Sequence, residues 1–303
     1  MILALSGFAL IGAIVLAGWV LGRWGGLPED AGAVLGAVAY SVLAPCLLFT
    51  GVAAADLTLL FTRSLLVFAL AAGACFAVFV LLFRRRDRGT RLLGALAGSY
   101  TNANYIGLPI ATYVLGDPAL VVPIILVQLL LVTPATLITL EIVTTGRASW
   151  RTAIAGPVRN PLILSVLAGV VVSVTGVRVP AVIADPVGAL GQAAVPVVLL
   201  AFGMSLARRW VLEPGPDRRP AVVAVAMKVT VMPALAFLLA WAFRLPHEAM
   251  YAVTVLAALP TAQNVFLYAQ QFQTGVVLVR DAVFLSTVCC LPAMLLIAFL
   301  FNR

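Results

Sequence analysis

Charged residues are scarce in this sequence of 303 residues. Only 10% of the residues are Asp, Glu, Lys or Arg, whereas 63% are hydrophobic, and the mean hydropathy is +1.14. In a soluble domain roughly a quarter of the residues are charged and about half are apolar. The composition therefore excludes a soluble protein and indicates an integral membrane protein.

Histidine is nearly absent, and the cysteines lack a metal-binding spacing. The chain has one histidine, His247, and four cysteines, which fall inside apolar runs without a C-x-x-C pair. We find no H-E-x-x-H or G-x-S-x-G motif and no cofactor signature. The polar stretches 144–157 and 207–220 are too short for a soluble catalytic domain. The sequence therefore predicts no enzyme, no metal site and no cofactor, with sodium left open as a coupling ion.

Long apolar runs dominate the sequence instead. A helix needs about 20 apolar residues to cross a hydrocarbon core about 30 Å thick. Ten runs meet this requirement, approximately at 2–22, 31–55, 60–83, 92–115, 119–143, 158–177, 184–206, 221–243, 249–272 and 276–300. We therefore expect an all-α integral membrane protein with ten transmembrane helices. The first run lacks the basic flank of a signal peptide, so we expect it to be retained.

The basic residues are distributed unevenly between the loops. Fourteen arginines fall in the loops that follow odd-numbered runs, and four fall on the opposite side. Because cytoplasmic loops carry the excess of Lys and Arg, the odd-numbered loops are expected in the cytoplasm. Both termini then face outward from the plasma (inner) membrane. The net charge of +8 is explained by this orientation, so we expect membrane lipid, and no nucleic acid, as a partner.

Proline spacing indicates an internal repeat. Pro45 and Pro196 lie 151 positions apart, and Pro109 and Pro260 have the same separation. A repeat of five helices is odd, so the second copy must enter the membrane from the opposite face. We therefore expect two inverted five-helix repeats, residues 1–150 and 151–303. This architecture is typical of secondary transporters.

Two of the runs carry polar interruptions at matching positions, TNANYIGLP within 92–115 and ALPTAQNVF within 249–272. Proline removes a backbone donor and frees a carbonyl that lipid cannot satisfy. A pair of broken helices is therefore a pointer to a transport site at mid-membrane. We expect the new half-helices to begin near Ile110 and Thr261, with their amides facing a small anion such as a carboxylate. The alternative is two kinked helices packed through Gly and capped by Asn.

These segments resemble those of the auxin efflux carrier family, which includes the plant PIN-FORMED carriers and bacterial organic-acid carriers. NANYIGLP, ALPTAQNVFLYAQQF and the LPED…APCLLF stretch carry the resemblance, which covers nearly the whole chain. It implies crossed broken helices 4 and 9, in a fold like that of bile-acid symporters and sodium–proton antiporters. It also implies an elevator-like carrier that forms a homodimer. Helices 1, 2, 6 and 7 (about 2–55 and 158–206) would be the scaffold, and helices 3–5 and 8–10 (about 60–143 and 221–300) would move.

The sequence departs from the plant carriers at several points. Thr101 stands where they have proline, Gln270 and Gln271 stand where they have a Lys-Glu pair, and the long cytoplasmic loop is absent. The chain is therefore more similar to the bacterial members, and auxin is not the expected substrate.

The interruptions and the resemblance together predict a substrate site. By resemblance, Asn102 contacts the substrate carboxylate and Gln128 lines the pocket. The full predicted set is Asn102, Asn104, Gly107, Pro109, Gln128, Pro260, Thr261, Gln263 and Asn264. We expect a secondary transporter of a small organic anion. The alternatives are a sodium-coupled symporter or a cation antiporter on the same fold, or a membrane receptor that does not translocate its ligand.

One cation lies within a predicted helix. Lys228 is about two turns into run 221–243, where a lysine costs about 2.5–3.5 kcal/mol at full depth. Three roles stay open: a structural or coupling pair with Glu141, snorkelling to the interface, or contact with the substrate. No Asp or Glu lies near mid-depth, which argues against a carboxylate-based proton antiporter, and Asp281 can pair with the adjacent Arg280.

Overall fold

The computed structural model describes residues 2–28, 30–54, 62–107, 110–111, 114–117, 120–145, 161–208 and 211–301. Within these ranges the chain is helical and has no strand longer than an isolated bridge. Six continuous helical segments are long and apolar enough to cross a membrane, and Gly12–Trp24 and Pro161–Thr175 are shorter apolar helices. The expectation of an all-helical membrane protein is therefore confirmed.

The first half of the chain contains α1 to α8, with η denoting a π-helical turn. Its elements are α1 (Ile2–Trp24), α2 (Ala31–Val38), η1 (Ala39–Leu43), α3 (Ala44–Ala53), α4 (Arg63–Leu82), α5 (Arg88–Ala97), η3 (Ala103–Gly107), α7 (Val122–Val127), η5 (Gln128–Val132) and α8 (Thr133–Thr145). The predicted runs therefore hold to within a few residues, except that run 92–115 is divided.

The second half contains α10 to α16. Its elements are α10 (Pro161–Thr175), α11 (Ala181–Arg208), α12 (Arg218–Ala226), η6 (Met227–Val231), α13 (Met232–Ala242), α14 (His247–Ala257), α15 (Gln263–Gln271) and α16 (Val276–Phe301). Run 249–272 is divided between α14 and α15. The two interrupted runs are thus the two divided ones.

Proline positions explain the π-helical turns. Pro45, Pro134 and Pro233 each stand two residues after the last residue of η1, η5 and η6. In each case the residue before the proline donates its N–H to the carbonyl five residues back, as Thr133 does to Gln128. Because proline has no N–H and its ring clashes with the carbonyl one turn earlier, a wider turn relieves the clash without ending the helix.

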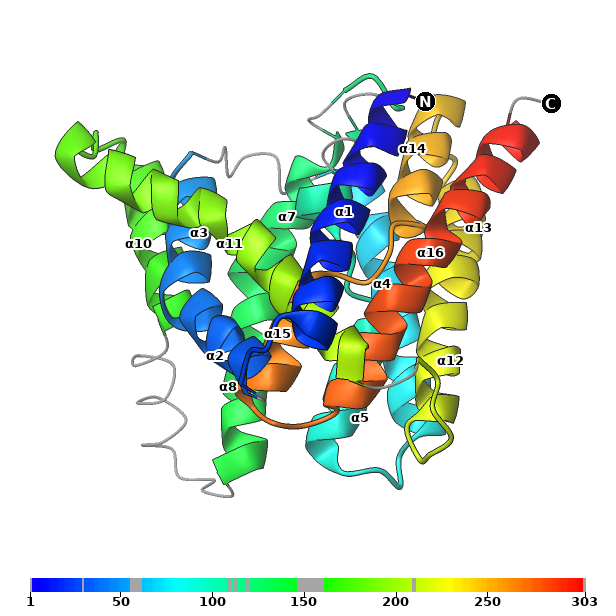
Figure 1. Ribbon diagram of the computed structural model, residues 1–303. Helices are drawn as coiled ribbons and strands as arrows, with labels where there is room; N and C mark the ends of the chain where they lie inside the picture. The colour runs from blue at the N-terminus through cyan, green and yellow to red at the C-terminus, as the bar shows by residue number, and fades with distance from the viewer. Residues whose placement is uncertain are drawn as a thin grey trace.

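The helices pack in two groups (Figure 1). In one group α11 contacts α1, α2 and α3, and α10 packs on α3. In the other, α13 contacts α4 and α14, while α16 contacts α5, α12 and α14. The α15 helix contacts both groups, since it packs on α16 and also on α2 and α11. The second part of the divided run 249–272 therefore lies where the two groups meet.

Glycine permits the close approach of α1 and α11. A Cβ at Gly18 would overlap the backbone of Leu200, and one at Gly203 would overlap the carbonyl oxygen of Val15. Helices in lipid associate through close packing and not through the hydrophobic effect, so small residues at the contact are favoured. These glycines therefore fix the distance between the two helices.

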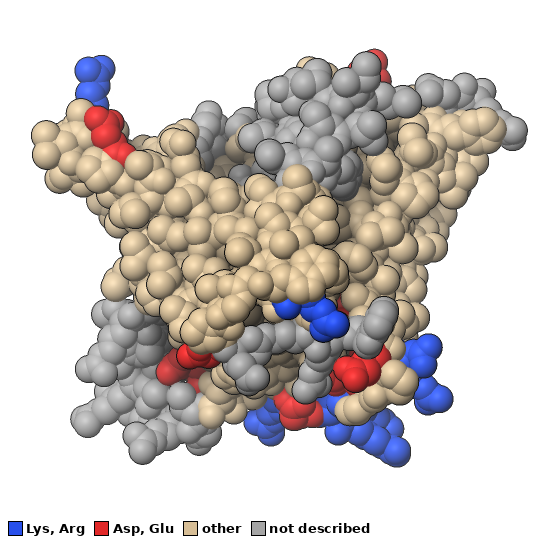
Figure 2. Space-filling view, in the orientation of Figure 1, with Lys and Arg blue, Asp and Glu red and all other residues tan. Residues whose placement is uncertain are grey.

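The two ends of the molecule differ in charge. Figure 1 places both termini at the upper end, and Figure 2 shows the Lys and Arg side chains gathered mainly at the lower end. At that lower end Arg86 forms an ion pair with Asp217 at 3.2 Å and a hydrogen bond to the carbonyl of Pro216. The basic end therefore lies opposite the termini.

Candidate functional site

The two divided helices meet by main-chain hydrogen bonds. In Figure 1, α5 rises from the lower end and α14 descends from the upper end. Beyond these helices, Thr101 and Thr261 form an isolated antiparallel bridge. The N–H of Asn102 donates to the carbonyl of Pro260 at 2.8 Å, and the N–H of Ala262 donates to the carbonyl of Tyr100 at 3.2 Å. The bridge supplies hydrogen-bond partners to backbone groups that the broken helices leave free. Such partners are required inside a membrane, because the hydrocarbon core supplies none.

The position of the first break differs from the prediction. The chain leaves α5 at Gly98 and resumes helical structure at Ala103, so the expected start near Ile110 is wrong. Gly107 lies within η3, where its N–H donates to the carbonyl of Asn102 at 2.9 Å. Pro109 lies outside the described residues, but it follows η3 at the same sequence distance as the prolines that follow the other π-helical turns.

The second break lies close to the predicted position, because α15 begins at Gln263 with Ala262 as its cap. Since the bridge pairs residue 101 with residue 261, Pro260 corresponds to Tyr100. The main-chain bonds at the crossing therefore relate positions that are 160 apart, whereas Pro109 and Pro260 are 151 apart. The crossing and the proline spacing therefore indicate different offsets between the two halves, and the repeat of 1–150 and 151–303 stays a prediction.

The amide side chains from the two halves bond to each other. Nδ2 of Asn102 donates to Oε1 of Gln263 at 2.7 Å, and the two residues are 1% and 3% exposed. The arrangement therefore presents amide N–H donors in a buried place, where hydrogen bonds to an anion are strong.

At the crossing, fewer backbone N–H groups are available to bind an anion than the sequence predicts. The N–H groups of Asn102 and Ala262 form the bridge, and the N–H of Thr261 donates to Oγ of Ser286 at 3.0 Å. The hydroxyl of Thr261 donates to the carbonyl of Ala97 at 2.5 Å. These groups stabilise the crossing itself, so an anion would depend more on side-chain amides than on half-helix ends.

A group of buried hydroxyls lies beside the crossing and was not anticipated. Oγ1 of Thr133 lies 3.1 Å from the hydroxyl of Tyr100 and 3.2 Å from that of Tyr268. Asn264, which is half-buried on α15, interacts with the Tyr100 hydroxyl. The only sequence signal for these residues was their position next to the interruptions and next to Pro134.

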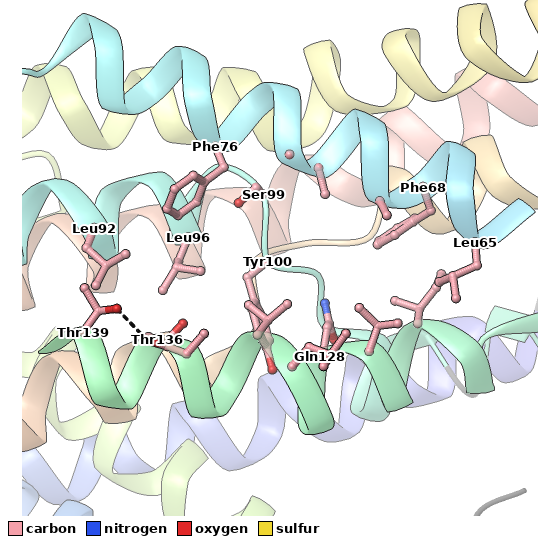
Figure 3. Close-up of a pocket in the computed structure, with 18 residues that line it drawn as sticks. Leu65, Phe68, Phe76, Leu92, Leu96, Ser99, Tyr100, Gln128, Thr136 and Thr139 are labelled. Carbon is pink, nitrogen blue, oxygen red and sulfur yellow. Dashed lines mark hydrogen bonds between the residues drawn. The ribbon is translucent and has the colours of Figure 1, made fainter. Parts of the chain in front are cut away.

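Gln128 lies in a separate cavity of about 460 Å³ between α4, α5 and α8. Figure 3 shows Phe68 and Phe76 from α4 and Gln128 from η5 directed into it, with Tyr100 between the two sides. Leu131 on its rim is 64% exposed, so the cavity opens on the outer surface of the helices. The structure thus places Gln128 next to Tyr100, in a largely apolar pocket. The side chain of Asn104 lies outside what the structure describes.

Lys228 has a partner other than the expected one. The side chain is fully buried, and Nζ donates to the carbonyl of Ala257 at 2.7 Å and contacts Sδ of Met232 at 3.4 Å. It neither snorkels nor pairs with Glu141 in the part of the chain that the structure describes. Ala257 is the last residue of α14, so the ammonium caps the negative end of that half-helix.

The second buried cation has the predicted partner. Nη2 of Arg280 lies 2.7 Å from Oδ1 of Asp281, and both residues are buried. Oδ2 of Asp281 accepts a hydrogen bond from the N–H of Leu212 at 3.0 Å. The pair thus joins the start of α16 to the segment after α11. Among the described residues, no three His, Cys, Asp or Glu side chains gather where a metal ion could be held.

In comparisons with known proteins, the chain is similar to membrane transport proteins. A family model described as "Membrane transport protein" matches residues 8–152 and 147–298. A "Putative malonate transporter" of Rhizobium meliloti (strain 1021) is 30% identical over 222 residues, and the match covers 66% of this chain and 66%, just under two thirds, of that relative. An "Uncharacterized transporter" of Methanothermobacter thermautotrophicus is 27% identical over 291 residues, with 93% of each chain covered.

Proposed function

The chain belongs to the membrane transport protein family, the auxin efflux carrier family that its motifs resemble, and we propose that it is a secondary transporter of a small organic anion. The observation that carries the proposal is the buried hydrogen bond between Asn102 and Gln263 at the crossing of the two broken helices. Amide N–H groups suit a carboxylate and carry no charge of their own, so the bound anion is held without being trapped by an ion pair.

Malonate is the first substrate to test. One relative is named for malonate, and a short dicarboxylate fits a site made of two side-chain amides and neighbouring hydroxyls. The family membership favours a transporter over an enzyme. A receptor that does not translocate would bind the anion but would not exchange it across a membrane.

The architecture supports an elevator-like mechanism. We propose ten membrane-spanning segments in two inverted repeats, 1–150 and 151–303, in which the two divided helices are segments 4 and 9. The group containing α1, α2, α3, α10 and α11 would be the fixed scaffold, and the helices α4, α5, α7, α8 and α12–α16 would move. The position of α15 between the groups supports this division.

The scaffold also offers a surface for a second copy of the chain. The apolar side chains of Leu164, Leu167, Val171 and Val174 on α10 are exposed. Such a surface suits either lipid or the scaffold of a partner subunit, and we propose the homodimer that the family resemblance implies.

Counterflow in proteoliposomes tests the proposed function. Vesicles loaded with unlabelled malonate should accumulate labelled malonate if the protein is a carrier. Asn102→Ala and Gln263→Ala should each reduce the initial rate at least tenfold, because each removes one of the paired amides. Gln271→Ala is the matched control, since this glutamine lies on the same helix as Gln263 but is exposed.

The controls separate folding from transport. Each variant should elute as a single species in detergent and unfold near the wild-type temperature. Full counterflow by folded Asn102→Ala protein would rule out the crossing as the substrate site. Binding of malonate without counterflow in the wild type would favour the receptor.

A further inference from the structure

The backbone of the crossing has two-fold symmetry. The two main-chain bonds run from Asn102 to Pro260 and from Ala262 to Tyr100, so each residue is related to the one 160 positions away. Thr101 and Thr261, which face each other in the bridge, are therefore equivalent positions.

The two threonine hydroxyls break this symmetry. The hydroxyl of Thr261 donates to the carbonyl of Ala97, the last residue of α5. The equivalent acceptor for Thr101 is the carbonyl of Ala257, the last residue of α14. That carbonyl accepts instead from Nζ of Lys228. Among the described residues, Oγ1 of Thr101 is the buried side-chain oxygen or nitrogen without a hydrogen-bond partner, and Thr101 is 0% exposed.

The Lys228 ammonium lies at the C-terminal end of α14, where a metal cation could also bind. The C-terminal end of a helix carries a partial negative charge. In transporters with broken helices, carbonyls at such ends coordinate coupling cations. In the described part of the chain the ion pairs join Arg86 to Asp217 and Arg280 to Asp281, so the positive charge of Lys228 faces a helix end and not a carboxylate. A polar group left unpaired in a buried place is costly, so the orphaned hydroxyl marks an unused ligand.

We propose that the Lys228 ammonium occupies a monovalent-cation site at the crossing, formed by the carbonyl of Ala257 and the hydroxyl of Thr101. The wild-type protein supplies this cation from its own side chain and needs no sodium there. Removing the ammonium opens the site to Na⁺, which prefers oxygen ligands of this kind. The inference goes beyond the proposed function, because it concerns a cation and not the transported anion.

The test is thermal unfolding of purified protein in sodium chloride and in choline chloride at equal ionic strength. The wild type should have the same Tm in both salts. The Tm of Lys228→Ala should rise by about 3 °C or more when the sodium concentration is tenfold the dissociation constant of sodium for the opened site. The gain should disappear in Lys228→Ala/Thr101→Val. It should persist in Lys228→Ala/Thr254→Val, because the hydroxyl of Thr254 is already bonded to the carbonyl of Met250.

Three results would overturn the inference: a sodium-specific shift in the wild type, no shift in folded Lys228→Ala, or a shift that survives Thr101→Val. If Lys228→Ala does not fold, Lys228→Ser, whose short side chain also leaves the ammonium position empty, is judged by the same sodium-dependent shift. These measurements need no substrate, so their failure is distinct from a failure of malonate counterflow.

Discussion

Two buried cations are stabilised in different ways at the residue scale. Lys228 donates to a main-chain carbonyl at the end of α14, whereas Arg280 forms an ion pair with Asp281. The carboxylate of Asp281 also accepts the N–H of Leu212. A buried ion pair whose remaining lone pairs are satisfied is stable, but loss of one partner leaves an uncompensated charge.

Arg280→Met should therefore destabilise the protein strongly. We expect the free energy of unfolding to fall by about 3–5 kcal/mol, because Asp281 would stay charged and buried. The double variant Arg280→Met/Asp281→Asn should recover a large part of that loss. Unfolding in detergent by heat or denaturant measures both effects.

The partly exposed pair of Arg86 and Asp217 is the control. Its side chains are 28% and 25% exposed, so Arg86→Met should cost less than about 1 kcal/mol. Equal losses for Arg86→Met and Arg280→Met would contradict the assignment of Arg280 as a buried structural charge.

Individual contacts were predictable only where both partners are side chains. Arg280 and Asp281 are adjacent and of opposite charge, so their pairing could be inferred from the sequence. The partner of Lys228 is a backbone carbonyl 29 positions away, which no residue type reveals. Asn102 and Gln263 were both expected at the site, but their mutual hydrogen bond depends on a register that only the structure supplies.

At the scale of helices, the apolar runs predict the helix bounds better than the prolines predict the positions of the breaks. The bounds of the apolar runs agree with the helices to within a few residues, because length and hydropathy are set by the membrane. Proline within an apolar run does not by itself mark a break, because Pro45, Pro134 and Pro233 follow π-helical turns inside continuous helical segments. The first break lies at Gly98, 11 residues before Pro109, so the proline did not mark its position.

Gly203→Ala tests the contact between α1 and α11. A Cβ there would overlap the carbonyl of Val15 and crowd Trp19, so the helices must separate. We expect a loss of about 2 kcal/mol or more, in the range of overpacked cores. Thermal unfolding of the purified variant measures the loss.

Gly188→Ala is a matched control in the same helix. No atom lies within 4 Å of a Cβ built at Gly188. Alanine is a better helix former than glycine by about 1 kcal/mol, so this variant should be as stable as the wild type or more stable. A Gly203→Ala protein with wild-type stability would show that the close approach is not needed.

At the scale of the whole molecule, the charge distribution predicts orientation. The basic end lies opposite the two termini (Figures 1 and 2). If the positive-inside rule applies, the basic end is cytoplasmic and both termini face outward. The segment between α10 and α11 then faces outward, and the segment between α11 and α12 faces the cytoplasm.

Cysteine labelling checks this orientation. Val177→Cys, in a position that is 61% exposed, should react in intact cells with a maleimide that cannot cross the membrane. Glu213→Cys, also exposed, should react only after the cells are permeabilised. The native cysteines lie in apolar helices, so the wild type should remain unlabelled and serves as the background. The opposite labelling pattern would invert the topology.

The main-chain bridge between Thr101 and Thr261 has a consequence for how the protein can change over time. Its hydrogen bonds come from peptide groups, which every residue except proline can supply in full. Side chains around the bridge can therefore change during evolution while the bridge itself is kept. Distant relatives can in this way keep the same crossing although their side chains around it differ.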